Sequence, residues 1–323
     1  MACGRLLPGL VIVLVVLLGY SLPAAGAPDA FQLFAAVPDD VDLGVSFDEQ
    51  QGGGGLVGET VRILNGNSFV SRADVFFASA HILGLGFSAF YNSQSSFAQS
   101  LGAGWSHTYS VLLNPSYSFR GKTYIRVVDA TGRGRYFRKQ DRGVCGGAFQ
   151  ERSRVTAEED GFTWHRLDGS RYGFTDTGRL LWIDDEKSNR LQLDDDGLDR
   201  LAAVTDLASG RRLTFNYNEN DLIESIAGPV TAMAPDGIRV VFGYDANLNL
   251  ASVTYVDGSG FDYSYADGLD IHNLTAIRNR AGHLINTWAY DDQDRCIENF
   301  SPSGRGVAVD YDSERRVKVT DAY

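Results

Sequence analysis

A hydroxyl and an imidazole stand side by side at Ser106 and His107, and Asp74 lies upstream of them. These residue types make up a Ser–His–Asp triad, in which the imidazole activates the hydroxyl for attack on a carbonyl. Adjacent residues of a strand point to opposite faces, so an extended segment would separate Ser106 from His107. The segment Gly104-x-Ser106-x-Thr108 also differs from the sharp turn that exposes a hydrolase nucleophile. We therefore expect a packing cluster here, and no catalytic residues.

Residues that bind metals or cofactors lack the required spacing. Asp194-Asp195-Asp196-Gly197 resembles part of a calcium loop, but the first and last ligand positions would be Gln192 and Ala203. A solvated acidic turn and weak surface binding of calcium both stay open there. Gly84-x-Gly86-x-x-Ala89 matches a dinucleotide pattern, yet no helical run follows it. The histidines show no zinc-ligand spacing: His81, His107, His165, His272 and His283. We expect no cofactor and no metal.

The composition favours strands as the elements that position these residues. The 323-residue chain is 44% hydrophobic, with 15 Tyr, 18 Phe, 36 Gly and only 2 Met. Its net charge of −12 argues against a nucleic-acid surface along the whole chain, because phosphate binding needs positive charge. Most of the excess negative charge lies in residues 171–323, which hold 15 Lys and Arg against 26 Asp and Glu. The basic stretch 121–143 is expected to be a solvated hairpin face rather than a polyanion site.

The first residues have the pattern of a secretory signal peptide. A single charge at Arg5 precedes the apolar run 9–22, and small residues follow at 24–27. The run is short for a membrane-spanning helix, which needs about 20 residues. We predict that residues 1–27 are removed, that 28–58 form a Gly-rich linker, and that the mature chain is secreted, periplasmic or at the cell surface, without a membrane span.

Two cysteines remain after such cleavage, Cys145 and Cys296. Export to an oxidising compartment would allow them to pair. Cys296 occupies an apolar position of the repeat described below, which favours a buried free thiol. The sequence leaves both outcomes open.

The second half of the chain is repetitive. Apolar residues recur at every second position in short runs that end in an aromatic residue, and a polar turn and a second run follow each one. This is the pattern of β-hairpins. Some second runs are apolar at i and i+3 instead, as at Leu180 and Ile183, which predicts a bulge. The anchors of the units are spaced 19 to 27 residues apart: Phe174, Leu193, Tyr217, Tyr244, Tyr265, Tyr290 and Tyr311.

These units resemble the YD repeats of the rearrangement-hot-spot (RHS) family, which includes teneurin-like and toxin-complex shell proteins. The matching stretches include FGYDANLNLASVTYVDGSG at 242–260 and VDYDSERRVKVTDAY at 309–323. The upstream segment resembles the domain that commonly precedes such repeats. Its motif residues are Asn65, Gly66, Asn67, Asp74, Tyr91, Asn92, Ser93, Gly104, Trp105, Ser106 and His107. The repeat residues are Tyr217, Tyr244, Asp245, Tyr265, Tyr290, Asp291, Tyr311 and Asp312.

The resemblance implies an all-β protein of antiparallel hairpin repeats that form a partial β-spiral, a YD shell. We expect a leader β domain at 59–115, connecting hairpins at 116–170 and about seven repeats at 171–323. The Tyr side chains should pack inward while Asp caps the turns. The implied function is a non-catalytic scaffold with a surface-contact or carbohydrate-recognition role. The alternative is the front part of a toxin delivery shell. Expected partners are cell-surface glycans or a protein that covers the open C-terminal strand edge.

Overall fold

A computed structural model describes residues 56–57, 60–62, 65–77, 83–95, 100–119, 121–139, 143–149, 151–187, 189–232, 234–311 and 317–322. The predicted signal peptide lies outside these residues, and so does the predicted linker apart from residues 56–57. All the named elements are β-strands, which confirms the predicted all-β class. A short pair, β1 (Leu56–Val57) and β2 (Val61–Arg62), precedes two larger sheets.

The smaller of these is the leader sheet, formed by β3 (Phe69–Phe77), β4 (Leu85–Asn92) and β5 (Trp105–His107). Its strands pair in the order β3-β4-β5 and are antiparallel. Alternate residues of β4 are buried, namely Leu85, Phe87, Ala89 and Tyr91, as the strand period predicts. The leader sheet therefore presents one strongly apolar face.

The larger sheet contains 20 strands, β6 to β25, and each is antiparallel to the next one in the sequence. The first eight are β6 (Leu112–Phe119), β7 (Lys122–Val128), β8 (Gly134–Lys139), β9 (Val144–Gly147), β10 (Arg154–Glu158), β11 (Gly161–His165), β12 (Arg171–Thr175) and β13 (Leu180–Asp184). The next six are β14 (Arg190–Asp195), β15 (Leu201–Asp206), β16 (Arg212–Tyr217), β17 (Ile223–Ala227), β18 (Arg239–Tyr244) and β19 (Leu250–Tyr255). The last six are β20 (Gly260–Ser264), β21 (Ala276–Asn279), β22 (Leu284–Tyr290), β23 (Cys296–Phe300), β24 (Gly306–Tyr311) and β25 (Val317–Ala322).

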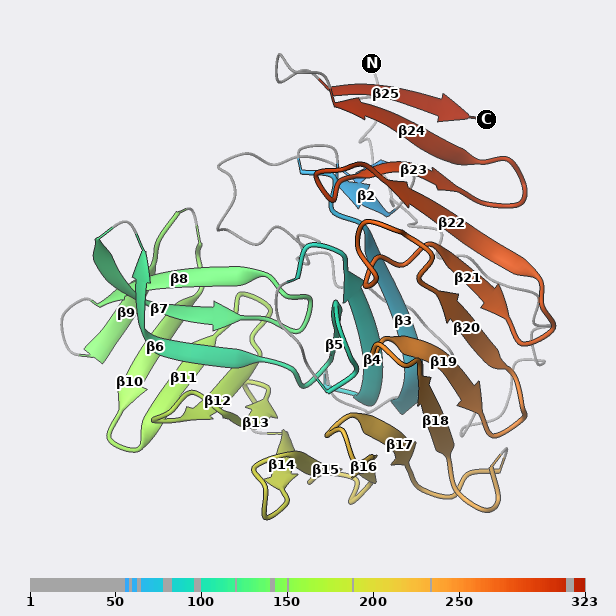
Figure 1. Ribbon diagram of the computed structural model, residues 1–323. Coiled ribbons are helices and arrows are strands. Elements are labelled where there is room, and N and C mark those ends of the chain that lie inside the picture. Colours follow the sequence, from blue (N-terminus) through green and yellow to red (C-terminus); the bar gives the residue numbers. More distant parts are fainter. Residues whose placement is uncertain are drawn as a thin grey trace, which may run out of the picture.

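The sheet closes on itself where β6 meets the β12–β13 turn. Leu112 forms a bridge with Arg179, and the Leu113 amide donates to the Gly178 carbonyl over 2.9 Å. Strands β6 to β13 thus form one ring, and the later strands continue the same sheet in a second curve (Figure 1). β6 starts inside the segment expected to belong to the leader, and the sheet runs without a break past residue 170.

A bulge recurs where the first strand of a hairpin reaches its aromatic end. The register shifts at Phe174, Tyr217, Tyr244 and Tyr290. A bulge adds one residue to one strand and so returns the following side chains to the same face. This explains why Leu180 and Ile183 are both buried although they are three residues apart.

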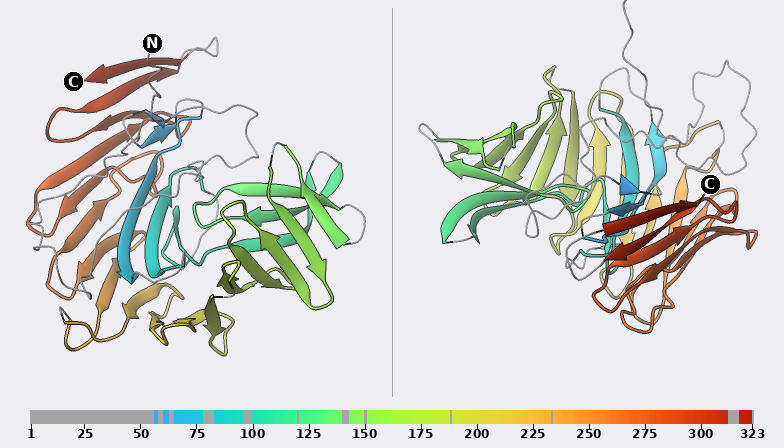
Figure 2. Two further views of the ribbon diagram at one scale, coloured as in Figure 1. Left: turned by 180° about the vertical axis from the view of Figure 1, so that it is seen from behind. Right: turned by 90° about the horizontal axis from the view of Figure 1, so that it is seen from above.

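The main core lies between the leader sheet and the inner face of the later strands. The Phe87 ring of β4 lies 5.8 Å from the ring of Phe215 on β16 and 6.0 Å from that of Phe242 on β18. Figure 2 shows the leader strands against the inside of the curved sheet. Because the leader fills this concave side, each sheet buries the apolar face of the other.

Candidate functional site at the leader–repeat interface

Ser106, His107 and Asp74 do not assemble into a triad. The Ser106 hydroxyl donates to the Ala130 carbonyl over 2.7 Å, while His107 Nε2 lies 3.0 Å from Ser100 Oγ on the other side of β5. Asp74 is bound by Arg72 instead. The expected packing cluster is present, because His107 lies among Phe87, Tyr109 and Phe215.

The His107 imidazole is neutral. Its burial lowers the pKa to about 3. The backbone amide of Tyr109 donates to Nδ1 over 3.3 Å, so Nε2 carries the proton and donates it to Ser100 Oγ. A ring that donates to the hydroxyl cannot act as its general base.

A buried ion pair on β3 joins the leader to the repeats. Arg72 Nε and Nη2 donate to the two Asp74 carboxylate oxygens over 2.6 and 2.8 Å. The Tyr255 hydroxyl donates to Asp74 Oδ1 over 2.7 Å, and Arg72 Nη1 donates to the Tyr263 hydroxyl. Burial alone would lower the pKa of Arg72, but the Asp74 charge raises it well above its ordinary value. Arg72 therefore keeps its charge, and the two side chains have hydrogen-bond partners from β19 and β20.

Sequence reasoning singled out Asp74 but missed Arg72, Tyr255 and Tyr263. A signal was present, because Arg72 and Asp74 are the charged residues of an otherwise largely apolar strand, FVSRADVFF. Charges inside such a strand are rarely buried unless they are paired. The tyrosine partners lie more than 180 residues away, and nothing local marks them.

Leader atoms also bind backbone amides of three hairpins. Ile223 donates to the Ser100 carbonyl over 2.7 Å, and Cys296 donates to the Gly66 carbonyl over 2.7 Å. Leu274 donates to the Tyr91 hydroxyl over 2.9 Å. Ile223 and Cys296 each follow a bulged turn, where the ladder leaves backbone groups unpaired. The leader satisfies those groups.

The other leader motif residues hold its loops. Asn67 Oδ1 accepts hydrogen bonds from Ser93 Oγ and the Gln94 amide, both over 3.2 Å. The Asn65 side chain accepts from the Asn67 amide over 3.2 Å. Trp105 Nε1 reaches the repeats and donates to the Tyr265 hydroxyl over 2.8 Å. Gly104 has a φ of +72° and accepts the Asn92 amide with its carbonyl over 2.8 Å.

The repeat tyrosines form a ladder of hydrogen bonds from one hairpin to the one before it. Each hydroxyl donates to the carbonyl of the residue that starts, or shortly precedes, an earlier strand. The pairs are Tyr217–Leu201 (2.9 Å), Tyr244–Ile223 (2.7 Å), Tyr265–Leu250 (2.9 Å), Tyr290–Leu274 (3.0 Å) and Tyr311–Cys296 (3.3 Å). Burial raises the pKa of these phenols, to about 12 for Tyr217, so they remain protonated donors. The sequence indicated inward packing but not this ladder.

The aspartates after the tyrosines bind the backbone of their turns. Asp245 Oδ1 accepts the amides of Asn247 and Asn249, both over 2.9 Å. Asp291 Oδ1 accepts the amides of Gln293 and Arg295 over 3.0 and 2.9 Å. Asp312 lies outside the described residues. These carboxylates act as turn caps and are not gathered at one site.

Cys145 and Cys296 are both buried and free, so they form no disulfide in this structure. Burial raises the pKa of the Cys296 thiol to about 12, which makes it a poor nucleophile. No group of three or more His, Cys, Asp or Glu side chains among the described residues is arranged to hold a metal ion. Within the same residues no helix has the length and apolarity needed to cross a membrane.

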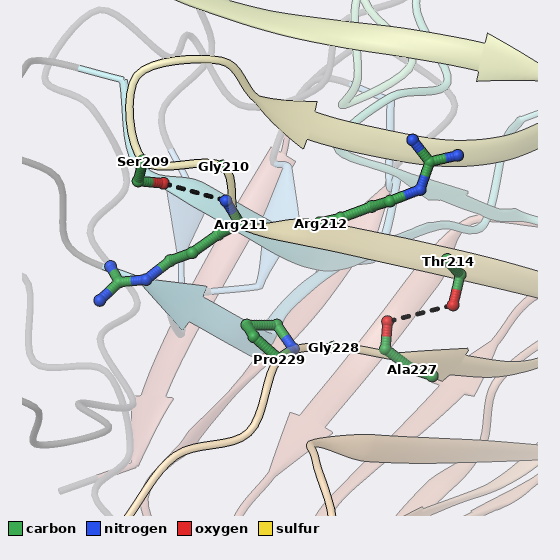
Figure 3. Close-up of a pocket in the computed structure, with 8 residues that line it drawn as sticks. All are labelled: Ser209, Gly210, Arg211, Arg212, Thr214, Ala227, Gly228 and Pro229. Atoms are coloured by element: carbon green, nitrogen blue, oxygen red, sulfur yellow. Dashed lines mark hydrogen bonds between the residues drawn. The ribbon is translucent and has the colours of Figure 1, made fainter.

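A shallow hollow of about 380 Å³ lies between the β15–β16 turn and the end of β17. Arg211 and Arg212 line it, but their side chains extend in opposite directions (Figure 3). Arg212 pairs with Asp194 over 2.8 Å, and Arg211 lies over the Phe77 ring. The charged groups that line the hollow therefore do not converge on a position where one ligand could bind.

Residues 58–137 match a family model described as a domain of unknown function, DUF6531. This domain is found in RHS/YD-repeat toxin proteins. The resemblance to the RHS/YD-repeat family is confirmed. The matched residues include the leader sheet and the first strands of the long sheet, up to Phe137 on β8.

The chain is also 24% identical over 283 residues to the double-stranded DNA deaminase toxin A of Burkholderia cenocepacia (strain H111). The match covers 83% of this chain and 19% of the relative, so the chain spans about a fifth of that protein.

Solved structures of toxin complexes show weaker likeness. A crystal structure of TcdB2-TccC3-TEV is 11% identical, with 73% of this chain and 18% of that chain covered and a TM-score of 0.19. The Tc holotoxin pore of Photorhabdus luminescens is 11% identical, with 80% and 23% covered and a TM-score of 0.17. TM-scores this low do not show that the whole chain is arranged as in those structures.

Proposed function

We propose that this chain is a non-catalytic section of a toxin shell, in which hairpin repeats build the wall and the leader sheet fills its concave side. The observation that carries the proposal is the leader–repeat interface. The buried Arg72–Asp74 pair and the backbone contacts of Ser100, Tyr91 and Gly66 tie the leader to successive hairpins. A leader held in this way serves as an inner plug at its end of the wall.

We place the deaminase chemistry of the relative outside the fifth of that protein that this chain spans. Zinc deaminases bind their metal through a Cys-x-x-Cys pair with a further His or Cys, and use a glutamate as general acid and base. The three cysteines here are Cys3, Cys145 and Cys296, which are far apart in the sequence. We therefore assign to this section the structural role of the shell wall, and not deamination. Export, and a contact or carbohydrate-recognition role, stay predictions from the sequence.

Amide hydrogen exchange on the full chain tests the plug. We expect the amides of β4 in the leader to be protected to within about tenfold of those of β18 and β19, because one cooperative unit opens together. A leader that exchanges a thousandfold faster than these repeat strands would refute the interface as the basis of the function.

A deamination assay separates the wall from an enzyme. The purified chain should leave cytosines in double-stranded DNA unchanged, with and without added zinc. Product formation above the rate of a heat-denatured sample would overturn the non-catalytic assignment.

A further inference from the structure

Five consecutive hairpins of the long sheet begin with an arginine. The first strands of these hairpins are β10, β12, β14, β16 and β18, and the arginines are Arg154, Arg171, Arg190, Arg212 and Arg239. The residue after each arginine packs on the core, as Val155, Leu213 and Val240 do. Neighbouring residues of a strand point to opposite faces, so the arginines lie on the outer face. Together they form the arginine row.

The arginine row is regularly spaced. Arg154, Arg171 and Arg190 lie in one line across the sheet, because register pairs connect them through His165 and Asp184. The last two arginines are displaced along their strands, so the row runs obliquely there. Each arginine lies two strands from the next, which is about 10 Å. The row thus follows the outside of the sheet from the ring into the second curve (Figure 1).

The opposite ends of these hairpins carry exposed acids. The turns that close the β10–β11, β12–β13, β14–β15 and β16–β17 hairpins contain Asp160, Asp176, Asp199 and Glu219, and all four residues are exposed. We call these residues the acidic row. Each of the four hairpins therefore begins at a cation and turns at an anion. The two rows have the same spacing, because both repeat once per hairpin.

The arginine row keeps a positive charge. Within the described ranges, neither Arg154 nor Arg239 forms an ion pair. Arg171 and Arg190 share the carboxylate of Asp184, over 2.8 and 2.9 Å. One carboxylate cannot balance two guanidinium groups. This part of the outer face is therefore positive on a chain whose net charge is −12.

The acidic row is also poorly balanced inside the chain. Among the residues with described positions, Asp160, Asp176 and Glu219 form no ion pair. Asp199 lies 3.6 Å from Arg179 and its side chain is 91% exposed. These carboxylates are accessible to a partner that carries positive charge.

We propose that the acidic row of one copy of this chain binds the arginine row of a second copy. Both rows follow the same hairpins, so their spacing and their course along the sheet agree. A shift of one copy along the strand direction brings the four acidic turns next to four arginines at once. The partner is therefore a copy of this chain, because its own hairpins supply anions at the spacing that the arginine row requires.

This contact is head-to-tail, because the two rows are different surfaces. Each copy that uses one row leaves its other row free, so further copies can be added. The proposal goes beyond the role of a wall section, since it stacks such sections along the strand direction. Exposed ion pairs are individually weak, and the net negative charge of each copy opposes association. Binding therefore depends on several pairs that form in register.

Double-stranded DNA fits the arginine row less well. It carries one charge per about 1.7 Å of its axis, whereas the arginines are about 10 Å apart. It is also stiff over about 150 base pairs, so it does not follow a row that curves around the sheet.

Sedimentation velocity on the full chain tests the contact. At about 0.1 M salt, where the Debye length is about 10 Å, we expect dimers and longer species whose share rises with protein concentration. At about 1 M salt, where the Debye length falls to about 3 Å, the chain should be monomeric. Association that persists at the higher salt concentration would be apolar and would overturn the proposal.

Two double variants separate the rows. Arg154→Gln with Arg212→Gln weakens the arginine row, and Asp160→Asn with Glu219→Gln weakens the acidic row of the same two hairpins. Each double variant should self-associate about tenfold more weakly than the unaltered chain. An equimolar mixture should form dimers but no longer species, because each variant keeps one intact row. A contact between two identical surfaces would not give this result.

Arg305→Gln with Asp236→Asn is the matched control. Both residues are exposed and lie outside the two rows, so this variant should associate like the unaltered chain. The proposal fails if the unaltered chain is monomeric at every concentration, if the row variants associate normally, or if their mixture forms no dimers. Circular dichroism of each variant separates loss of the contact from loss of the fold.

Fluorescence anisotropy of a labelled DNA duplex tests the other partner. We expect no rise in anisotropy at about 0.1 M salt, where phosphate contacts still contribute to affinity. Binding of the duplex that Arg154→Gln with Arg212→Gln abolishes, in a chain that stays monomeric, would assign the arginine row to nucleic acid and overturn the proposal.

Discussion

The imidazole of His107 lies in an apolar cluster, and this environment decides its chemistry. A histidine next to a serine suggests a base and a nucleophile. Burial removes the imidazolium form, and the hydrogen bond from the Tyr109 amide fixes the proton on the other nitrogen. The residue types alone are compatible with a catalytic pair and with a packing cluster. Only the geometry of the strand distinguishes these two possibilities.

The pH dependence of stability should reveal this burial. The pKa of His107 is about 3 when folded against an ordinary 6.5, so the unfolded chain binds the proton first as pH falls. The contribution of His107 to the free energy of unfolding is therefore fully present above pH 6.5. It decreases by about 1.4 kcal/mol per pH unit as the pH falls toward 3.

Urea unfolding at pH 6.5 and 5 measures the effect. The unaltered chain should lose about 2 kcal/mol more over this interval than His107→Gln does. His283→Gln, at an exposed histidine, should behave like the unaltered chain. Identical pH profiles for the unaltered chain and His107→Gln would contradict the buried neutral imidazole.

Leu248 occupies a turn position that suits glycine. Its φ is +63°, and its side chain is 41% exposed. A left-handed conformation costs a branched or bulky residue about 1–2 kcal/mol. Leu248→Gly should therefore stabilise the chain by about 0.5–1 kcal/mol, after the entropic cost of glycine is subtracted.

Leu198 supplies the comparison, because it lies in an equivalent turn, is exposed and has an ordinary φ. Leu198→Gly should destabilise by up to about 1 kcal/mol. Thermal unfolding of the two variants gives the answer, and a change of the same sign in both would count against backbone strain at Leu248.

At the scale of elements, the sequence predicted the hairpins far better than it predicted the contacts between distant hairpins. Alternating apolar residues and aromatic ends such as Val240, Phe242 and Tyr244 predicted strands, and Leu180 with Ile183 predicted the bulge. Both signals are local. The bridge between Leu112 and Arg179, in contrast, joins residues that are far apart in the chain. Neither residue is of a type that would identify this contact among many possible ones.

Gly178 tests the closure of the ring. It has a φ of +91°, and a Cβ there would overlap the Leu113 carbonyl oxygen. Gly178→Ala combines backbone strain with displacement of β6, and we expect a loss of about 3 kcal/mol or more. Gly258 has a φ of +79° with no atom near its Cβ position, so Gly258→Ala should cost only about 1–2 kcal/mol.

Chemical denaturation of both variants measures this difference. Equal losses would mean that the contact between β6 and the β12–β13 turn contributes nothing to stability.

At the scale of the whole molecule, the leader and the later repeats depend on each other. The motif residues indicated that a leader exists, but not that it lies inside the curve of the repeats. That placement rests on partners such as Arg72 with Tyr263 and Trp105 with Tyr265, which are separated by more than 150 residues. No spacing rule in one sequence reports such pairs.

Asp74 tests the joint between the two parts. Asp74→Ala leaves the Arg72 guanidinium buried without its carboxylate, and we expect a loss of about 3–5 kcal/mol. The double variant Arg72→Met with Asp74→Leu removes both charges and should recover most of it. Urea unfolding provides the values. If the double variant is as unstable as the single one, the loss does not come from an unpaired charge.

The tyrosine ladder has a direction, and this bears on how the chain is made. Tyr244 reaches back to Ile223, and Tyr311 reaches back to Cys296, so each hydroxyl bonds to a residue synthesised earlier. The leader, which supports several hairpins, is synthesised before all of them. Every new hairpin thus finds its support already present as it leaves the ribosome or a translocation channel. The wall can be assembled in the order of synthesis, one hairpin at a time.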